Sequence, residues 1–408
     1  MSRVLLLTQV LPYPPDAGPK IKTYYVLRYL ASAGHVITLA SFVRRDEEKY
    51  LDDLKPYCVA IHAVPMRRSR LADVAAYASC LCTGQPFLVA RDAKTEMFDL
   101  VRRLVREQPF DIIHADQLTM AQFALQSRQS LIPNHQSPAL VFDAHNAVWT
   151  IVQRAQQTAP FFLRPLLARE ACALKKHEGA LCNVMDATLA VSEVDKRALV
   201  EAGADARKIS VIAIAIDSAQ LEPVKRSDDS ANILTIGTLF YPPNADGVRW
   251  FMRQVYPLIR AQVPASSLTI VGPRPPQDIS QFAIRNSQFV TVTGYVPDLQ
   301  PYLERAALMV VPVRAASGMR VRILEALARG IPIVTTTTGV EGIDAVHDEH
   351  LLIADEPEQF AAEVVRLLRD AELRRRLAIN GRRLIEDKYD WRVVLPKLEA
   401  VYESFARR

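Results

Sequence analysis

The chain has 408 residues, of which 50% are hydrophobic and 23% charged, and its formal net charge is +5. This length corresponds to roughly two or three ordinary domains, and the hydrophobic content excludes an intrinsically disordered protein. The weak positive charge favours anionic ligands such as nucleotide phosphates or acidic lipids, but it is too small to indicate a nucleic-acid-binding protein.

Short apolar runs alternate with helical patterns along the first half of the chain. The expected strands are 4–9, 36–42, 61–64, 112–115, 140–143, 187–191 and 209–214, and the expected helices are 21–33, 97–107 and 165–182. Strands that alternate with helices predict an α/β domain in which helices cover both faces of a parallel sheet. We expect this N-terminal Rossmann-like domain to span 1–222, followed by a polar linker at 223–230.

A second series of the same kind follows the linker. Its expected strands are 233–237, 267–271, 290–293, 308–311, 331–335 and 351–353, and the closing helices are 359–369, 371–385 and 393–406. Asn244 is expected to cap the N-terminus of a helix that reaches Arg260. We place the second Rossmann-like domain at 231–386. Two such domains would face each other across a cleft at the carboxyl ends of their strands, where ligands bind.

Three features that are absent from the sequence indicate in which compartment the protein is located. Val4 follows Met-Ser-Arg directly, with neither a long apolar region nor a cleavage site, so no signal peptide is expected. The apolar stretch 71–90 is interrupted by polar residues and a proline, which argues against a membrane-spanning helix. The five scattered cysteines form no zinc-site spacing, and idle thiols suit a reducing compartment. We therefore expect a cytoplasmic protein.

The loop after the first expected strand, Leu-Pro-Tyr-Pro-Pro-Asp-Ala-Gly-Pro-Lys, ends at Gly18 and Lys20 and runs into a helix. A strand, a loop and a helix N-terminus in this order suit a bound phosphate. The plain alternative is a proline-rich turn. The pattern G-x-G-x-x-G is absent, which disfavours a dinucleotide-dependent dehydrogenase.

Polar residues also end two later strands of the first domain. Asp143-Ala-His145-Asn146 follows one strand, and His114 and Asp116 end the preceding one. His145 could donate a hydrogen bond to a sugar hydroxyl or stabilise developing charge. The other candidates for acceptor contacts are Lys20, His114, Asp116 and Asn146. A lone histidine is, however, more often structural than functional.

The most informative stretch is 317–339, in which a loop with one glycine and two arginines precedes a short helix. A helix N-terminus offers unpaired N–H groups and a partial positive charge, and Arg320 and Arg322 add cations that hold phosphate oxygens in pairs. Glu325 follows Arg322 by three residues and can share its helical face. A hydroxyl-binding carboxylate beside a diphosphate site predicts a nucleotide-sugar ligand. The alternative is an ordinary αβ unit with a solvated basic turn.

These motifs resemble glycosyltransferase family four, a group of retaining enzymes with two facing Rossmann-like domains in the GT-B fold. The run Leu-Glu-Ala-Leu-Ala-x-Gly-x-Pro-Ile-Val is the most specific match, and the resemblance extends from Leu5 to about Phe405. It implies that Gly18 packs under the donor diphosphate, that His145 lies near the reacting carbon, and that the final segment, 387–408, crosses back onto the N-terminal domain. The sequence is identified as a divergent bacterial member.

The resemblance also assigns the donor site. It implies that Glu325 holds the ribose, and that backbone groups of Gly294, Tyr295 and Val296 hold the base. The donor sugar would meet three loop residues, which are Ser317, Gly318 and Met319.

The sequence departs from the family at functional positions. Ser317 stands where the family has a glutamate, and 237–244 lacks the usual arginine and lysine that neutralise the diphosphate. We hypothesise that Arg320 and Arg322 perform that neutralisation, which makes them catalytic candidates together with His145 and Glu325. No Asp-x-Asp pair occurs, and such a pair commonly binds the divalent metal in metal-dependent transferases. The prediction is therefore no metal and no cofactor beyond the donor substrate.

Two basic stretches suggest one further partner. Arg67-Arg68-Ser-Arg70 precedes the apolar run 71–82, and Arg102-Arg103-x-x-Arg106 lies on an expected helix. Such a surface could rest on acidic headgroups at the inner face of the plasma membrane, although a solvated face is the favoured explanation.

The complete interpretation is a metal-independent, retaining glycosyltransferase of bacterial polysaccharide or surface-glycan synthesis. It would use a nucleotide-sugar donor and a glycan, lipid-linked or small-molecule acceptor, with no nucleic acid as partner. Two alternatives stay open: a nucleotide-sugar epimerase of the same architecture, and a non-catalytic nucleotide-sugar-binding subunit.

Overall fold

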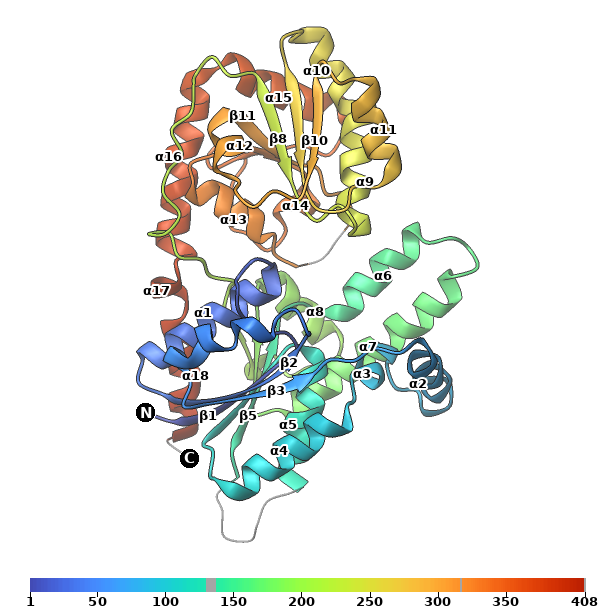
Figure 1. The fold of residues 1–408 in the computed structure, drawn as a ribbon, viewed down its shortest axis with the longest axis vertical. Helices are drawn as coiled ribbons and strands as arrows, with labels where there is room; N and C mark the ends of the chain where they lie inside the picture. Colours follow the sequence, from blue (N-terminus) through green and yellow to red (C-terminus); the bar gives the residue numbers. More distant parts are fainter. Residues whose placement is uncertain (130–136, 316–317, 407–408) are drawn as a thin grey trace. The chain divides into compact units, whose positions relative to one another are not determined.

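The structure, a computed structural model, describes residues 1–129, 137–315 and 318–406 (Figure 1). It divides into two compact units. Unit 1 consists of residues 1–215 together with 394–408, and unit 2 consists of residues 216–393. Both units are α/β, with one parallel sheet each, as the sequence predicts.

Unit 1 is built on a seven-stranded parallel sheet with the order β3-β2-β1-β4-β5-β6-β7. Its strands are β1 (Arg3–Thr8), β2 (Val36–Val43), β3 (Ala60–Pro65), β4 (Ile112–Asp116), β5 (Ala139–Ala144), β6 (Ala187–Ala190) and β7 (Ile209–Val211). Every residue of β4 is buried, which is typical of a parallel strand covered on both faces.

Helices cover this sheet. They are α1 (Gly18–Ser32), α2 (Arg70–Thr83), α3 (Phe87–Arg91), α4 (Thr95–Glu107), α5 (Ala121–Gln129), α6 (Val148–Thr158), α7 (Arg164–Val184), α8 (Glu193–Glu201) and α18 (Pro396–Ala406). Helix α4 shows why these segments fold as they do. Its buried residues, Met97, Leu100, Val101, Leu104 and Val105, recur every three or four positions and pack into the core of unit 1.

Unit 2 contains a six-stranded parallel sheet with the order β10-β9-β8-β11-β12-β13. Its strands are β8 (Asn232–Ile236), β9 (Ser267–Val271), β10 (Val290–Gly294), β11 (Ala306–Val311), β12 (Ile333–Thr335) and β13 (Leu352–Ile353). Its helices are α9 (Pro242–Trp250), α10 (Tyr256–Gln262), α11 (Gln277–Arg285), α12 (Gln300–Arg305), α13 (Val321–Ala328), α14 (Thr337–Val340), α15 (Pro357–Arg369) and α16 (Ala371–Lys388), with α17 (Trp391–Val394) at the boundary to unit 1. A π-helical turn, Phe251–Val255, joins α9 to α10.

The boundaries of the units differ from the expected ones. Unit 1 ends at residue 215 rather than 222, and the segment 223–230 lies in unit 2. There the Arg226 guanidinium donates hydrogen bonds to the carbonyl oxygens of Ala307, at 2.9 Å, and Gly330, at 2.8 Å. A charged composition indicated a solvated linker, but backbone carbonyls of unit 2 hold this arginine in place.

Unit 2 also extends further towards the C-terminus than residue 386. Asp390 accepts hydrogen bonds from the backbone N–H of Ser218, at 3.0 Å, and from its hydroxyl, at 2.6 Å. The N–H of Ile216 donates to the carbonyl of Tyr389 at 3.0 Å. These contacts tie the end of α16 to the first residues of unit 2.

The expected helix cap at Asn244 is wrong, because α9 begins two residues earlier and Tyr241 takes the N-cap position. Two prolines open the helix, and proline suits the first turn, where an N–H group has no partner within the helix. The Asn244 side chain instead donates to the carbonyl of Thr238 at 3.0 Å.

None of the helices within the described ranges combines the length and the apolar character that crossing a membrane requires.

Candidate functional site

The two sheets share a topological feature that locates candidate sites. In unit 1 the chain order changes direction between β1 and β4, and in unit 2 it changes direction between β8 and β11. Helices that leave neighbouring strands on opposite faces open a crevice at such a point, beyond the carboxyl ends of the strands. We therefore expect the ligand site of each unit at that crevice.

In unit 1 the strand register brings acidic residues together at the crevice. Thr8, the last residue of β1, pairs with Asp116 at the end of β4, and Asp116 pairs in turn with Asp143 on β5. His145 follows β5 directly, and its Nε2 lies 2.7 Å from a carboxylate oxygen of Asp116. The hydroxyl of Thr23, on α1, donates to the other Asp116 oxygen at 3.0 Å. The expected residues Asp116 and His145 thus form one buried pair.

A second buried group surrounds Asp143. Lys22, on α1, forms an ion pair with one Asp143 oxygen, and His114 Nε2 lies 3.3 Å from the other. His114 Nδ1 lies 2.7 Å from the hydroxyl of Tyr402 on α18. Because Asp143 is an acceptor, His114 carries its proton on Nε2 and accepts from Tyr402 at Nδ1.

These contacts set the charge of Asp143. Burial alone would raise the pKa of Asp143, but the Lys22 ammonium and the hydrogen bond from His114 outweigh it and hold that pKa below the ordinary value. All three side chains are at most 2% exposed. His114 is therefore a buried member of this network, and the residues that line the cavity beside His145 do not include it.

The sequence reasoning missed Lys22 and Tyr402. A signal for Lys22 was present, because it lies one helical turn before the buried Val26 and so occupies a position on the apolar face of α1. No comparable signal existed for Tyr402, which is remote from His114 in the sequence.

A cavity of about 120 Å³ opens beside His145. Its polar lining consists of Gln9, Arg91, Gln117, Thr119, His145 and Asn146. The Thr119 hydroxyl is buried without a hydrogen-bond partner among the described residues. Neutral amide and hydroxyl groups around a small space can hold a hydroxyl-bearing ligand.

The other N-terminal candidates lie near the start of α1. Gly18 is the first residue of this helix, and Ala17, its N-cap residue, makes no side-chain cap. Lys20 forms ion pairs with Glu47, at 2.8 Å, and with Asp16, at 3.5 Å. The charge of Lys20 is thus already balanced by two carboxylates.

Asp116, Asp143 and His145 could hold a metal ion by their spacing, since their ligand atoms lie within 4.8 Å of one another. Both carboxylates are already occupied, however. Lys22 and His114 contact Asp143, and His145 and Thr23 contact Asp116. A metal ion would have to displace a buried cation, so this group fits an internal polar network better than a metal site.

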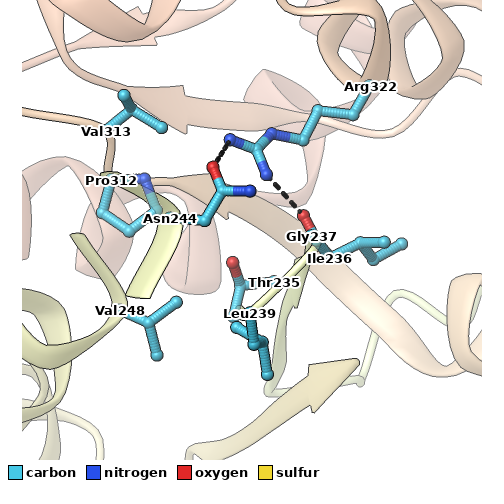
Figure 2. Close-up of a pocket in the computed structure, with 9 residues that line it drawn as sticks. All are labelled: Thr235, Ile236, Gly237, Leu239, Asn244, Val248, Pro312, Val313 and Arg322. Carbon is cyan, nitrogen blue, oxygen red and sulfur yellow. Dashed lines mark hydrogen bonds between the residues drawn. The ribbon is translucent and has the colours of Figure 1, made fainter. Parts of the chain in front are cut away.

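In unit 2 the crevice is occupied by the loop after β8, which packs against α13 (Figure 2). The Arg322 guanidinium donates to the carbonyl of Ile236 at 3.0 Å and to the side-chain oxygen of Asn244 at 2.8 Å. A Cβ atom on Gly237 would lie too close to an Arg322 guanidinium nitrogen, so a larger residue there would require the Arg322 side chain to move. Beside it remains a cavity of about 10 Å³, which has room for about one water molecule.

Arg322 is a buried cation whose contacts are neutral. Burial lowers its pKa to about 10, and the charge of Arg320 adds to this shift. Its Nε has no hydrogen-bond partner, and no carboxylate pairs with it, within the described residues. Arg320, the N-cap residue of α13, donates to the carbonyl of Gly318 at 2.6 Å.

Glu325 lies on the same helix, one turn beyond Arg322. Burial raises the pKa of its carboxyl group, and the nearby Arg329 charge opposes that shift. No hydrogen bond or ion pair of this carboxylate occurs in the described part of the chain. A shielded carboxylate and a buried guanidinium on one helix, neither contacting an opposite charge within the described ranges, can bind a ligand that has both anionic and hydroxyl groups.

The remaining donor-site candidates lie on two loops of unit 2. Gly318 has φ 81°, a left-handed conformation that favours glycine, and Met319 is buried. Gly294, with φ 72°, ends β10 and accepts a hydrogen bond from the N–H of Gly272 at 2.9 Å. Tyr295 is 75% exposed, and Val296 is half-buried. Ser317 lies outside the described residues.

Comparisons with known proteins bear on both units. A model described as "Glycosyltransferase Family 4" matches residues 23–220, and a model described as "Glycosyl transferases group 1" matches residues 230–370. The chain is 25% identical over 176 residues to an uncharacterized 44.6 kDa protein in the cps region of Klebsiella pneumoniae. That match spans 41% of this chain and 45% of the length of the relative.

Solved structures share the fold at low sequence identity. Sucrose-phosphate synthase from Thermosynechococcus elongatus matches with a TM-score of 0.72 and 19% identity over 100% of both chains. Anabaena HepE in complex with UDP and glucose matches with a TM-score of 0.68 and 14% identity, over 99% of this chain and 100% of that one. These similarities confirm the predicted GT-B fold class of two Rossmann-like α/β units.

Proposed function

This chain belongs to the glycosyltransferases, since models of family 4 and group 1 together match most of its length, and we propose that it transfers a sugar from a UDP-sugar to an acceptor hydroxyl. The reaction would retain the anomeric configuration and use no metal ion. The observation that carries this proposal is the pair of Arg322, a buried cation with neutral partners, and Glu325, a carboxylate with no partner among the residues that the structure describes.

The diphosphate of the donor would bind at the N-terminus of α13. A buried guanidinium without an anionic partner is unfavourable, and a phosphate group would supply the missing charge. Hydrogen bonds to Ile236 and Asn244 already fix the Arg322 side chain, so this side chain needs little reorganisation when a phosphate binds. Arg320 and the first N–H groups of α13 would stabilise the leaving diphosphate, and electrostatic stabilisation of this kind is commonly the largest catalytic contribution.

Glu325 would hold the ribose. A carboxylate accepts hydrogen bonds from two neighbouring hydroxyls, and the resulting contacts favour its charged form. The raised pKa of Glu325 indicates that this form is not stabilised by the protein alone. Gly318 and Met319 would then lie next to the donor sugar, and Gly294, Tyr295 and Val296 next to the base.

The acceptor would bind in the cavity of unit 1 beside His145. Gln9, Gln117, Thr119 and Asn146 supply neutral donors and acceptors, which suit the hydroxyls of a sugar or another polyol. The hydrogen bond from His145 Nε2 to Asp116 fixes the orientation of the imidazole. No side chain is assigned as a general base, because retention in the family implies assistance by the donor phosphate.

The relatives support the biological setting. HepE has been solved with UDP and with UDP-glucose, and the Klebsiella relative lies in a cps region. We therefore place the reaction in the synthesis of a bacterial surface polysaccharide, with a glycan, lipid-linked or small-molecule acceptor.

Nucleotide binding tests the donor site. Calorimetric titration of the whole chain with UDP should show binding, and Arg320→Ala should weaken it by roughly ten- to a hundred-fold, the value of a charge-assisted hydrogen bond. Arg314→Ala is the matched control, because Arg314 precedes the same helix but already pairs with Asp246 at 2.9 Å. Equal UDP affinity of the wild type and the Arg320 variant would contradict the proposal.

Product analysis separates the remaining alternatives. Incubation with UDP-sugars and a panel of acceptors should yield a glycosylated acceptor. An epimerised donor would instead identify an epimerase, and binding without turnover would identify a non-catalytic subunit. Activity should survive EDTA, and its loss on chelation would contradict the metal-independent mechanism.

A further inference from the structure

Helix α2 of unit 1 presents an apolar side to the solvent. Leu71 is 84% exposed, Val74 is 69% exposed and Leu81 is 59% exposed. Positions 71, 74, 78 and 81 recur at the spacing of one helical face. Cys80, on the opposite side, is fully buried. A surface helix normally has its apolar face turned inward, whereas α2 leaves Leu71, Val74 and Leu81 exposed.

A second exposed apolar group occupies the turn between α6 and α7, which form a helical hairpin in Figure 1. Phe161 is 82% exposed and Phe162 is 63% exposed, and the two rings contact each other edge-on with centroids 5.8 Å apart. Leu163 and Leu166 extend the group into the first turn of α7, at 38% and 44% exposure. Single exposed apolar residues are ordinary, but a cluster of this size indicates a binding surface.

Contacts within unit 1 join the two groups. The Arg169 guanidinium, on α7, donates to the carbonyl oxygens of Cys80 and, at 3.2 Å, of Gln85, which lie at the end of α2. The next residue, Glu170, accepts from the backbone N–H of Phe87 at 3.1 Å. The beginning of α7 is therefore fixed against the end of α2. We call the exposed faces of α2 and of the α6–α7 turn the apolar surface.

Cations without acidic partners border the apolar surface. Arg67 and Arg70 directly precede α2 and are exposed, and no carboxylate pairs with either of them within the described residues. Arg164 follows the phenylalanines, and its Nε donates to the carbonyl of Ala159 at 3.0 Å rather than to an acid. Arg68 differs, because it pairs with Asp92 at 3.1 Å. Exposed leucine and phenylalanine side chains, beside arginines with no acidic partner among the described residues, match the interface of an anionic bilayer.

We propose that unit 1 docks on a bilayer containing anionic phospholipid through this apolar surface. Helix α2 lies in the headgroup region, and Phe161 and Phe162 enter the boundary of the acyl chains. The arginines at 67, 70 and 164 contact the headgroup phosphates. This mode of binding places α2 on the membrane rather than across it. It goes beyond the transfer reaction, because it does not depend on which sugar is moved.

Vesicle flotation of the full chain tests the proposal. We expect the wild type to float with vesicles of phosphatidylcholine and phosphatidylglycerol, and to bind vesicles of phosphatidylcholine alone much more weakly. Phe161→Ser/Phe162→Ser should reduce binding roughly ten-fold or more, because two large apolar side chains no longer enter the bilayer. Arg67→Gln/Arg70→Gln should reduce binding by about thirty-fold, since each cation near an anionic surface strengthens binding by about five-fold.

Matched controls lie elsewhere on the chain. Ile379→Ser removes an apolar side chain that is 61% exposed in unit 2, and Arg102→Gln removes a cation that pairs with Asp99 at 3.4 Å. Both should bind vesicles as the wild type does. UDP affinity and thermal unfolding, measured without lipid, show that each variant is folded.

Two results would overturn the proposal. One is a wild type that does not float with anionic vesicles, or variants of the apolar surface that float as well as the controls. The other is a wild type that forms a dimer, becomes monomeric in Phe161→Ser/Phe162→Ser and has no affinity for lipid. That result would assign the apolar surface to a second copy of the chain.

Discussion

The two crevices differ in whether their buried charges have oppositely charged partners within the protein. In unit 1, Asp143 has Lys22 and His114 as partners, and Asp116 has His145 and Thr23, so the charges are balanced within the protein. In unit 2, Arg322 has neutral partners and Glu325 has none among the described residues. A satisfied network stabilises the fold, whereas unbalanced groups leave binding energy for a ligand.

This comparison predicts different responses to mutation. Variants of the unit 1 network should act mainly on stability, and variants of the unit 2 site mainly on nucleotide binding.

Lys22→Met should produce the largest loss of stability. It leaves the Asp143 carboxylate buried without its cation, which costs about 3–5 kcal/mol in comparable buried pairs. Urea unfolding measures this loss, and the double variant Lys22→Met/Asp143→Asn should recover part of it. A loss for Lys22→Met no larger than that of an exposed lysine would show that the pair does not stabilise unit 1.

Arg322→Met should lower the free energy of unfolding less than Lys22→Met does, by about 1–3 kcal/mol. The backbone carbonyl of Ile236 and the side-chain oxygen of Asn244 each lose a hydrogen bond, but a buried cation with an unfavourable environment is also removed. The decisive readout is UDP, which raises the unfolding temperature of a protein that binds it. UDP should stabilise the wild type and leave the Arg322 variant unchanged. Equal stabilisation of both would remove Arg322 from the donor site.

Tyr402→Phe should reduce stability by about 1 kcal/mol, because His114 Nδ1 loses its hydrogen bond to the tyrosine hydroxyl. Thermal unfolding measures the change. UDP affinity should be the same as in the wild type, because the unit 1 network is assigned no part in donor binding. A weaker affinity of the Tyr402 variant for UDP would contradict the assignment of donor binding to unit 2 alone.

The smallest effect concerns pH and distinguishes the two carboxylates. The pKa of Asp143 is lowered, so its contribution to stability is present above the unfolded value of 3.8 and is lost as the pH falls through the folded value. The pKa of Glu325 is raised, so its contribution is present below the unfolded value of 4.5 and is lost as the pH rises through the folded value. Glu325→Gln should therefore stabilise unit 2 slightly at neutral pH, by about 0.5 kcal/mol.

The same substitution should weaken UDP binding, because the ribose loses its carboxylate acceptor. In the wild type, affinity for UDP should fall as the pH is lowered from neutral through the raised pKa of Glu325, and in Glu325→Gln this dependence should flatten. Calorimetry at several pH values measures both. A Glu325 variant that binds UDP with wild-type affinity and pH dependence would show that this carboxylate does not hold the ribose.

Some elements and strand-end residues of the structure could be predicted from the sequence. The segment 317–339 predicted a short helix and a buried strand, and α13 and β12 confirm both. The sequence also placed Asp116 and His145 at strand ends, and the parallel register brings them into contact. Periodicity and strand-end position are local properties of a chain, so they can be recognised without coordinates.

Other features needed contacts between distant residues. The partners of Asp143 lie on α1 and β4, and Tyr402 reaches His114 from the far end of the chain. The charged segment 223–230 indicated a linker, but carbonyls of Ala307 and Gly330 hold Arg226 against unit 2. The apolar run 71–82 was recognised in the sequence, whereas its outward orientation depends on how α2 rests on the unit.

Alternation and spacing along the chain encode the α/β class, the two-part organisation and the loop and helix that carry Arg320, Arg322 and Glu325. Which charges are neutralised depends instead on how distant segments pack together. Lys22 packs against Asp143, whereas the β8 loop supplies Arg322 with a carbonyl and an amide oxygen. Electrostatic interactions in a buried site depend on distance and desolvation, and both are set by packing between segments that are far apart in the sequence.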